Sequence, residues 1–288
     1  MCRMCNSLGQ GGTWYLNPKN YSNRMYKLRE PGKRPTEALG NSPNAGAGQE
    51  AQAQTAAGGF RMALEAKANG DLDTFNQIIG EMNRRALMRP GGQVVPLFEV
   101  FEVLDMGMPV AAMMCICRKN TRACEECSLS EYTCMGLGSG MFKWERWPER
   151  YRGGVEFLST KQAKEWVEYW DKKGMMHMLM QEGGDFIGGL CNCDYPDCGP
   201  IRQRIDYGLY AQLVKGEFVC FIDWDKCNGC GDCLGRCHYN ALKWEATMEK
   251  AHIDQLNCFG CGLCETACPR DAISYLDRKK IPGLANVW

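Results

Sequence analysis

Two cysteine runs near the C-terminus decide the fold of this chain: CNGCGDCLGRC at residues 227–237 and CFGCGLCETACP at residues 258–269. Both have the spacing Cys-x2-Cys-x2-Cys-x3-Cys, and they start about thirty residues apart. This repetition indicates an internal duplication of one metal-binding unit. Three cysteines spaced by two residues let a tight loop surround three corners of an Fe4S4 cube, and the glycines between them permit positive φ angles.

The two runs resemble the bacterial 2x4Fe-4S ferredoxin family over about the last quarter of the chain. In that family the fourth cysteine of each run ligates the other cluster. The resemblance therefore implies one cluster held by Cys227, Cys230, Cys233 and Cys268, and a second held by Cys258, Cys261, Cys264 and Cys237. His238 departs from the family pattern, which usually has a proline there, whereas Pro269 keeps it. Two adjacent zinc ribbons fit less well, because zinc sites normally pair separated Cys-x2-Cys knuckles.

Short strands are predicted around both runs. Residues 218–222 lead into the first loop, a hairpin of residues 241–244 and 251–253 lies between the runs, and residues 272–275 follow the second run. Cys220 lies in the first of these strands, and we interpret it as a buried apolar residue that is not a ligand.

A second group of cysteines precedes these runs: Cys115, Cys117, Cys134, Cys191, Cys193 and Cys198, with Cys124 and Cys127 in a loop between them. Thiolates at this density in a reduced compartment usually bind soft metals. The two Cys-x-Cys pairs follow separate predicted strands and can converge on one site, where Arg118 would help to neutralise their charge. A third iron-sulfur cluster, a structural zinc, and free or buried cysteines all stay open as interpretations, because both kinds of centre accept four thiolates.

Residues 94–200 also resemble a domain found ahead of dicluster ferredoxin modules in proteins of anaerobic bacteria and archaea. The resemblance is carried by Cys115-Ile-Cys117-Arg118, by the segment from Cys134 to Gly138, and by Leu190-Cys-Asn-Cys193. It implies an iron-sulfur binding protein associated with redox complexes. Cys124 and Cys127 are extra to that pattern.

Composition narrows the class of protein. The 288 residues contain 34 Lys plus Arg and 34 Asp plus Glu, so no global charge points to nucleic acid or to an anionic membrane. The longest apolar stretch, residues 109–117, is too short to span a bilayer, and no secretory signal is visible. We therefore expect a cytoplasmic protein, in which the 19 cysteines serve metal binding and not disulfides. Cys2 and Cys5 form a lone pair, interpreted either as a tail feature or as additional ligands.

The fold class predicted is α+β, in three parts. Residues 1–59 are expected to form an extended arm and a linker rich in Gly, Ala and Gln, residues 60–214 a mixed and mainly helical cysteine-rich domain, and residues 215–288 the ferredoxin module with a C-terminal tail. Helices are predicted at 60–69, 71–88, 97–104, 159–173 and 201–214, and upstream strands at 110–116 and 175–180. Core packing explains the methionines around His177 better than metal binding does.

These patterns predict an electron-transfer subunit of an anaerobic oxidoreductase complex, whose partner is a catalytic subunit or a redox protein. The basic and aromatic stretch at residues 143–152 is a candidate docking segment. No dinucleotide loop, phosphate loop or catalytic triad is evident, so the chain is not expected to be an enzyme on its own. The alternatives are a redox enzyme whose upstream cysteines hold an open site, and a maturation or activation factor.

Overall fold

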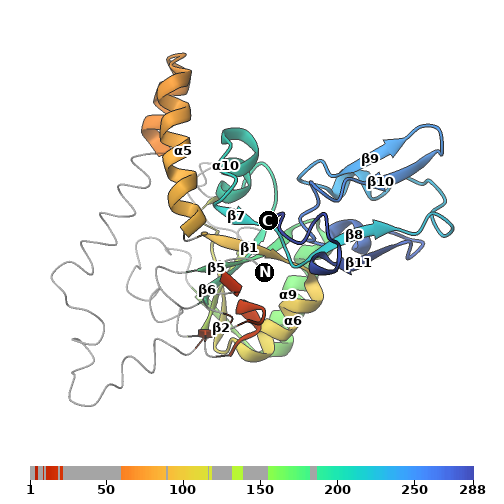
Figure 1. The fold of residues 1–288 in the computed structure, drawn as a ribbon. Helices are drawn as coiled ribbons and strands as arrows, with labels where there is room; N and C mark the ends of the chain where they lie inside the picture. The colour runs from red at the N-terminus through yellow and green to blue at the C-terminus, as the bar shows by residue number, and fades with distance from the viewer. Residues whose placement is uncertain are drawn as a thin grey trace.

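The computed structural model describes residues 4–5, 9, 11–18, 20–21, 60–88, 90–115, 117–118, 132–138, 155–181 and 187–288. A seven-stranded sheet is the centre of the upstream part, with the strand order β4-β2-β3-β6-β5-β1-β7 (Figure 1). Its strands are β1 (Gly92–Val95), β2 (Val110–Met113), β3 (Cys134–Leu137), β4 (Val155–Leu158), β5 (Met176–Gln181), β6 (Ile187–Cys193) and β7 (Leu213–Val214). All neighbours are antiparallel except β1 and β7.

Helices with recognisable caps flank this sheet. They are a helix over residues 60–68, α5 (Leu72–Met88), α6 (Leu97–Met106), α9 (Thr160–Lys172) and α10 (Gly199–Tyr207). Ser159 and Gln162 form a capping box at the start of α9, and the Asp71 carboxylate accepts a hydrogen bond from Thr74 N at 3.0 Å before α5. Helices α6 and α9 pack against each other beside the sheet, while α5 projects away from it (Figure 1).

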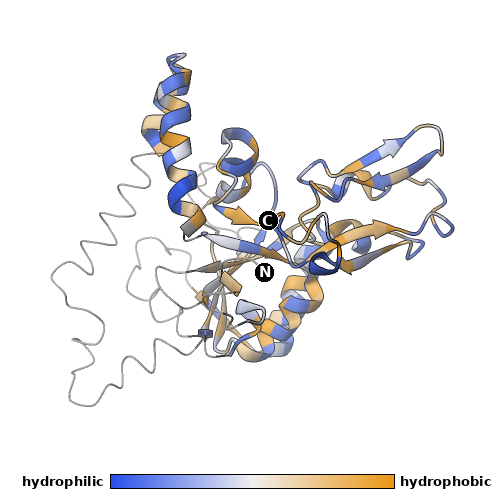
Figure 2. Ribbon diagram, in the orientation of Figure 1, coloured by the Kyte–Doolittle hydropathy of each residue, from blue (hydrophilic) through white to orange (hydrophobic). Residues whose placement is uncertain are grey.

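The main core lies between the sheet and helices α6 and α9. Figure 2 shows the apolar residues of these elements, in contrast to α5, where hydrophilic and hydrophobic residues alternate. The N-terminal segment belongs to this core, because Trp14 and Tyr15 in the 3-10 helix η1 (Trp14–Leu16) are fully buried. Trp14 Nε1 donates to Gln93 Oε1 at 2.6 Å. The prediction of an extended arm is therefore wrong for these residues, while the linker and residues 143–152 lie outside the described ranges.

The C-terminal part consists of two small antiparallel sheets. One pairs β8 (Phe218–Ile222) with β11 (Ile273–Asp277), and the other pairs β9 (Leu242–Glu245) with β10 (Lys250–Ile253). The short helices η4 (Leu234–Arg236), α11 (Leu263–Thr266) and η5 (Arg278–Lys280) complete it. These strands match the predicted ones to within two residues at either end.

The upstream predictions need three corrections. The helix predicted over 201–214 ends at Tyr207, because Gly208 adopts φ 72° and breaks it, and Leu213–Val214 is a strand. The strand predicted over 110–116 ends at Met113, before the cysteines. Although the fold is mixed as expected, a sheet and not the helices organises it, and β1, β3 and β4 were not predicted.

Candidate metal centres

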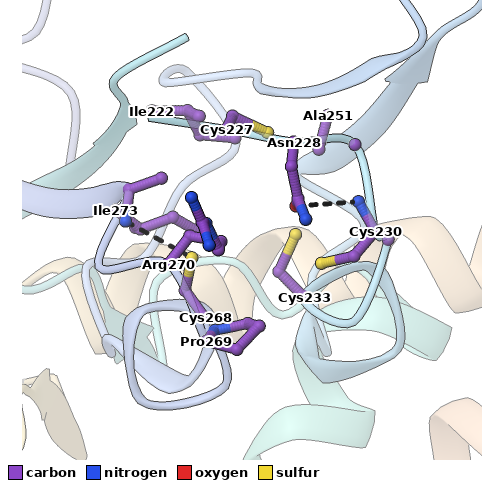
Figure 3. A pocket seen from close by; sticks show the side chains of 13 residues that line it. Ile222, Cys227, Asn228, Cys230, Cys233, Ala251, Cys268, Pro269, Arg270 and Ile273 are labelled. Atoms are coloured by element: carbon purple, nitrogen blue, oxygen red, sulfur yellow. Dashed lines mark hydrogen bonds between the residues drawn. The ribbon is translucent and has the colours of Figure 1, made fainter. Parts of the chain in front are cut away.

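The first cysteine loop surrounds a pocket together with one cysteine of the second run. Cys227, Cys230, Cys233 and Cys268 all line this pocket (Figure 3). Cys268 follows the second loop in sequence, but β11 leads back to β8 and brings it beside the first loop. The structure thus brings together the four cysteines that the family resemblance assigns to the first cluster.

The second set of four cysteines is also in mutual proximity. Burial raises the pKa of Cys261, and the nearby charges of Cys264, Cys237 and Cys258 raise it further. Cys237 belongs to the first run, so each loop has one cysteine of the other run beside it. We call these the outer set (Cys227, Cys230, Cys233, Cys268) and the inner set (Cys258, Cys261, Cys264, Cys237).

Backbone amides point at the sulfur atoms of both sets. Ala241 N donates to Cys237 Sγ at 3.2 Å, and Ala272 N donates to Cys268 Sγ at 3.4 Å. Both donors lie four residues after the cysteine, as the duplication requires. Such N–H groups stabilise anionic sulfur, so a donor set of thiols with amide support fits an iron-sulfur cluster.

Glycines make these loops possible at equivalent places in the two runs. Gly229 and Gly260 have φ angles of 75° and 71°. A Cβ at Gly229 would lie 2.3 Å from Glu249 O, and a Cβ at Gly260 would lie 2.1 Å from Phe218 O. Each loop therefore packs directly against a backbone carbonyl, and no side chain fits at either position.

The two sets differ in their exposure to solvent. Cys230 of the outer set is exposed, whereas Cys258 and Cys264 of the inner set are buried. The outer set is therefore the one that lies nearer to the surface.

A buried cation lies beside the inner set. Arg278 is fully buried and donates to the backbone oxygens of Gly216 at 2.9 Å, Cys258 at 2.8 Å and Phe218 at 3.1 Å, and also to that of Val287 at 3.4 Å. Its positive charge contributes to lowering the pKa of Cys258 to about 6, after the larger effect of a hydrogen bond with Cys220. No local pattern in the sequence marks this residue, because Arg278 reaches the loop from the far end of β11.

The upstream cysteines are brought together as well. We call the following six residues the upstream cysteine group: Cys115, Cys117, Cys134, Cys191, Cys193 and Cys198. The thiol of Cys115 lies near those of Cys117 and Cys134. Cys191 lies near Cys134 and Cys193, and Cys193 is also near Cys198. The charge of Cys198 in turn acts on Cys117, so the two ends of this series are near each other.

Sheet register explains this convergence. Cys134 on β3 is directly opposite Cys191 on β6, and Cys193 is two residues further along the same face. The chain after β2 supplies Cys115 and Cys117, and Cys198 is the N-cap of α10. In the part of the chain that is described, no three His, Cys, Asp or Glu side chains are arranged as ligands of one single ion.

Arg118 has a different role from the one predicted. Its guanidinium pairs with Asp194 at 2.5 Å and with Asp197 at 3.1 Å, so two carboxylates balance its charge. Only its backbone amide contacts the cysteines, because Arg118 N donates to Cys115 Sγ at 3.4 Å. The side chain therefore holds the segment after Cys193 in place.

The remaining cysteines are distributed as follows. Cys5 is fully buried in the main core, where its Sγ lies 3.1 Å from Glu217 Oε1, away from the metal candidates. Cys220 is buried as predicted, and its backbone N donates to Cys258 Sγ at 3.4 Å. Cys2, Cys124 and Cys127 lie outside the described residues.

Comparison with known proteins addresses the C-terminal part. Residues 226–272 match a family model described as a 4Fe-4S dicluster domain. A search of curated proteins finds no match for the chain. Among the helices of the described ranges, none has the length and apolar character needed to cross a bilayer. The chain therefore contains a ferredoxin-type 4Fe-4S domain at its C-terminus, within a mixed α/β structure.

Proposed function

We propose that this chain relays single electrons through two 4Fe-4S clusters, one bound by the outer set and the other by the inner set. The observation that carries the proposal is the presence of Cys268 in the pocket of the first loop. An exchange of the fourth ligand between the two loops explains why a cysteine of the second run lines that pocket.

The protein's contribution is to hold the ligands and to set their electrostatics. Thiolates of each set would fix four corners, and the amides of Ala241 and Ala272 donate to the two exchanged sulfurs. When bound, each cluster supplies a reversible one-electron couple. Arg278 places a fixed positive charge near the inner set, which favours the more negative, reduced state there.

The exposure of Cys230 suggests where an electron enters or leaves. The outer set is the nearer one to solvent, and a redox protein or catalytic subunit that docks there would exchange electrons with it. We propose that such a partner belongs to an anaerobic oxidoreductase in the cytoplasm. Chemistry on an organic substrate would then occur in the partner.

A double substitution tests the exchange of ligands. Cys230→Ala and Cys268→Ala should each remove or convert one cluster, which corresponds to a loss of up to about four iron ions. If both residues serve the same cluster, the double variant should lose no more iron than either single variant. A loss of about eight iron ions in the double variant would show that each loop keeps its own fourth cysteine.

The matched control is Cys5→Ala, which removes a buried thiol that belongs to neither set and lies in the main core. We expect it to keep the iron and acid-labile sulfide content of the wild-type protein. Iron, sulfide and EPR spectra of anaerobically purified variants supply the measurement. A wild-type protein without acid-labile sulfide would overturn the proposal as a whole.

A further inference from the structure

We propose that the upstream cysteine group is the binding site of a third iron-sulfur cluster, which lies against the inner set. The site is argued from the thiols themselves, independently of the two-cluster proposal. Its contact with the inner set, in contrast, rests on the proposed function.

The chemistry of the donors is the first argument. Six thiols from four separate segments lie near one another, because Cys134 is directly opposite Cys191 in the sheet, and Cys115, Cys193 and Cys198 are nearly inaccessible to solvent. Sulfur-only donor sets select soft metals and iron-sulfur clusters. A cysteine that only fills space in a core does not need five other thiols beside it. Free or buried cysteines are therefore a poor explanation of this group.

Amide donors form the second argument. Arg118 N donates to Cys115 Sγ at 3.4 Å, and the backbone of Gly199 bonds to Cys117 at the start of α10. Amide support of this kind is also present at Cys237 and Cys268 in the ferredoxin-type domain. The upstream group therefore has the same environment for anionic sulfur as the C-terminal sets.

The extent of the group favours a cluster over one ion. A tetrahedral zinc draws its four ligands to about 2.3 Å from a single point. Within the described ranges no three ligand side chains have such an arrangement, at the upstream group or at the C-terminal runs. A centre with several irons distributes its ligands over a larger volume, which suits six thiols that four separate segments of the chain supply.

The position of the group relative to the inner set is the fourth argument. Cys193, Cys198 and Phe259 are buried in one apolar cluster, against which Cys261 and Tyr239 pack. The rings of Tyr239 and Phe259 are stacked with centroids 3.5 Å apart, and Tyr239 lies near the charges of both Cys261 and Cys198. A structural ion would not need this proximity. A redox centre, in contrast, could exchange electrons with the inner set over a short path through buried side chains.

Metal analysis of the full chain tests the site. Wild-type protein, purified without oxygen, should contain about twelve iron ions and as much acid-labile sulfide, and no stoichiometric zinc or copper. The double variant Cys134→Ser with Cys191→Ser should lose about four of the iron ions. Cys5→Ser removes another buried cysteine far from the group, and it should lose none.

The complementary variant separates this proposal from the two-cluster proposal. Cys227→Ala with Cys258→Ala disrupts both C-terminal sets, so about four iron ions and one EPR signal should remain from the upstream site. This variant leaves the upstream site unchanged, so it still tests the third cluster if the upstream double variant does not fold. A wild-type content of no more than about eight iron ions would overturn the third cluster and leave the first two intact. Zinc or copper that is present in the wild type and lost on substitution of Cys134 and Cys191 would do the same.

Discussion

At the scale of single residues, Arg278 is the side chain that most directly affects the inner set. It is buried, and backbone oxygens hold it close to Cys258. A fixed positive charge stabilises the reduced cluster relative to the oxidised one. We expect Arg278→Gln to lower the reduction potential of the inner cluster by about 60 mV, which is a tenfold change in equilibrium constant for one electron. An EPR-monitored redox titration measures this shift.

The control for this prediction is Arg278→Lys, which keeps the charge but loses hydrogen-bond donors. It should shift the potential much less than the Gln variant. Equal shifts in both variants would mean that the geometry of the hydrogen bonds, and not the charge, sets the potential.

Glu99 gives the protein a pH-dependent stability. Burial raises its pKa to about 7, despite a hydrogen bond from Tyr15 Oη at 2.6 Å that lowers it. The folded protein therefore keeps its proton between pH 4.5 and 7, where the unfolded chain releases it. Stability is lost as the pH rises through this window, by about 3 kcal/mol in total. We expect the melting temperature of the wild-type protein to fall between pH 4.5 and pH 7, and to show no further fall from this group above that range.

The neutral variant Glu99→Gln should reduce this fall, because it has no proton to lose. Glu165→Gln, on the exposed face of α9, should leave the pH profile as it is. Parallel profiles for wild type and Glu99→Gln in thermal melts would disprove the assignment.

At the scale of elements, the second loop depends on the backbone freedom of Gly260. Its φ of 71° and the carbonyl of Phe218 leave no room for a methyl group. We expect Gly260→Ala to distort the loop, at a cost of about 1–3 kcal/mol for the φ angle alone, and to lower the iron content of the inner set. Gly235→Ala is the matched control, because nothing lies within 4 Å of a Cβ at that position. Similar iron content in both variants would contradict the prediction.

Local signals explain which elements were predictable. Helix α9 was located to within a residue because its capping box and amphipathic period lie in one short segment. Strand β1 (Gly92–Val95) was missed, since it follows two glycines and exists through pairing with β5 and β7, far along the chain. Strand β4 (Val155–Leu158) is an edge strand with a mostly exposed pattern, which resembles a loop in sequence.

At the scale of the whole molecule, the C-terminal module packs firmly on the sheet domain. Phe259 and Leu263 are buried in a cluster shared with Ile201 and Leu213. His238 Nε2 lies 2.9 Å from Gly174 O and adds a polar link. We expect residues 215–288 expressed alone to bind clusters, to melt at a lower temperature than the full chain, and to bind a hydrophobic dye, because the apolar face becomes exposed.

Replacing Phe259 by Ser in this isolated module should reduce the dye binding without restoring the melting temperature. An isolated module as stable as the full chain would mean that the shared apolar cluster contributes little. The predicted division of the chain at residue 215 would be tested in the same experiment.

The candidate sites were predictable to different degrees for a physical reason. Spacing predicted three ligands of each C-terminal set, because one short loop supplies them, whereas the exchange of the fourth cysteine was implied by the family resemblance; the assignment of all eight remains a prediction. The upstream cysteines were noticed, but their convergence depends on the adjacency of β3 and β6, which no local pattern encodes. The stack of Tyr239 on Phe259 and the pairing of Arg118 with Asp194 and Asp197 arise only from tertiary packing.

The placement of Cys268 beside the first loop has a consequence for biosynthesis. A ribosome releases residues 227–233 well before residue 268, so the outer set stays incomplete until the second run has been made. The inner set needs Cys264 as its last member and is completed only slightly sooner. Iron delivered to a polypeptide that stops before residue 264 would find neither of these two sets complete, so the loading of both would have to follow synthesis of the second run.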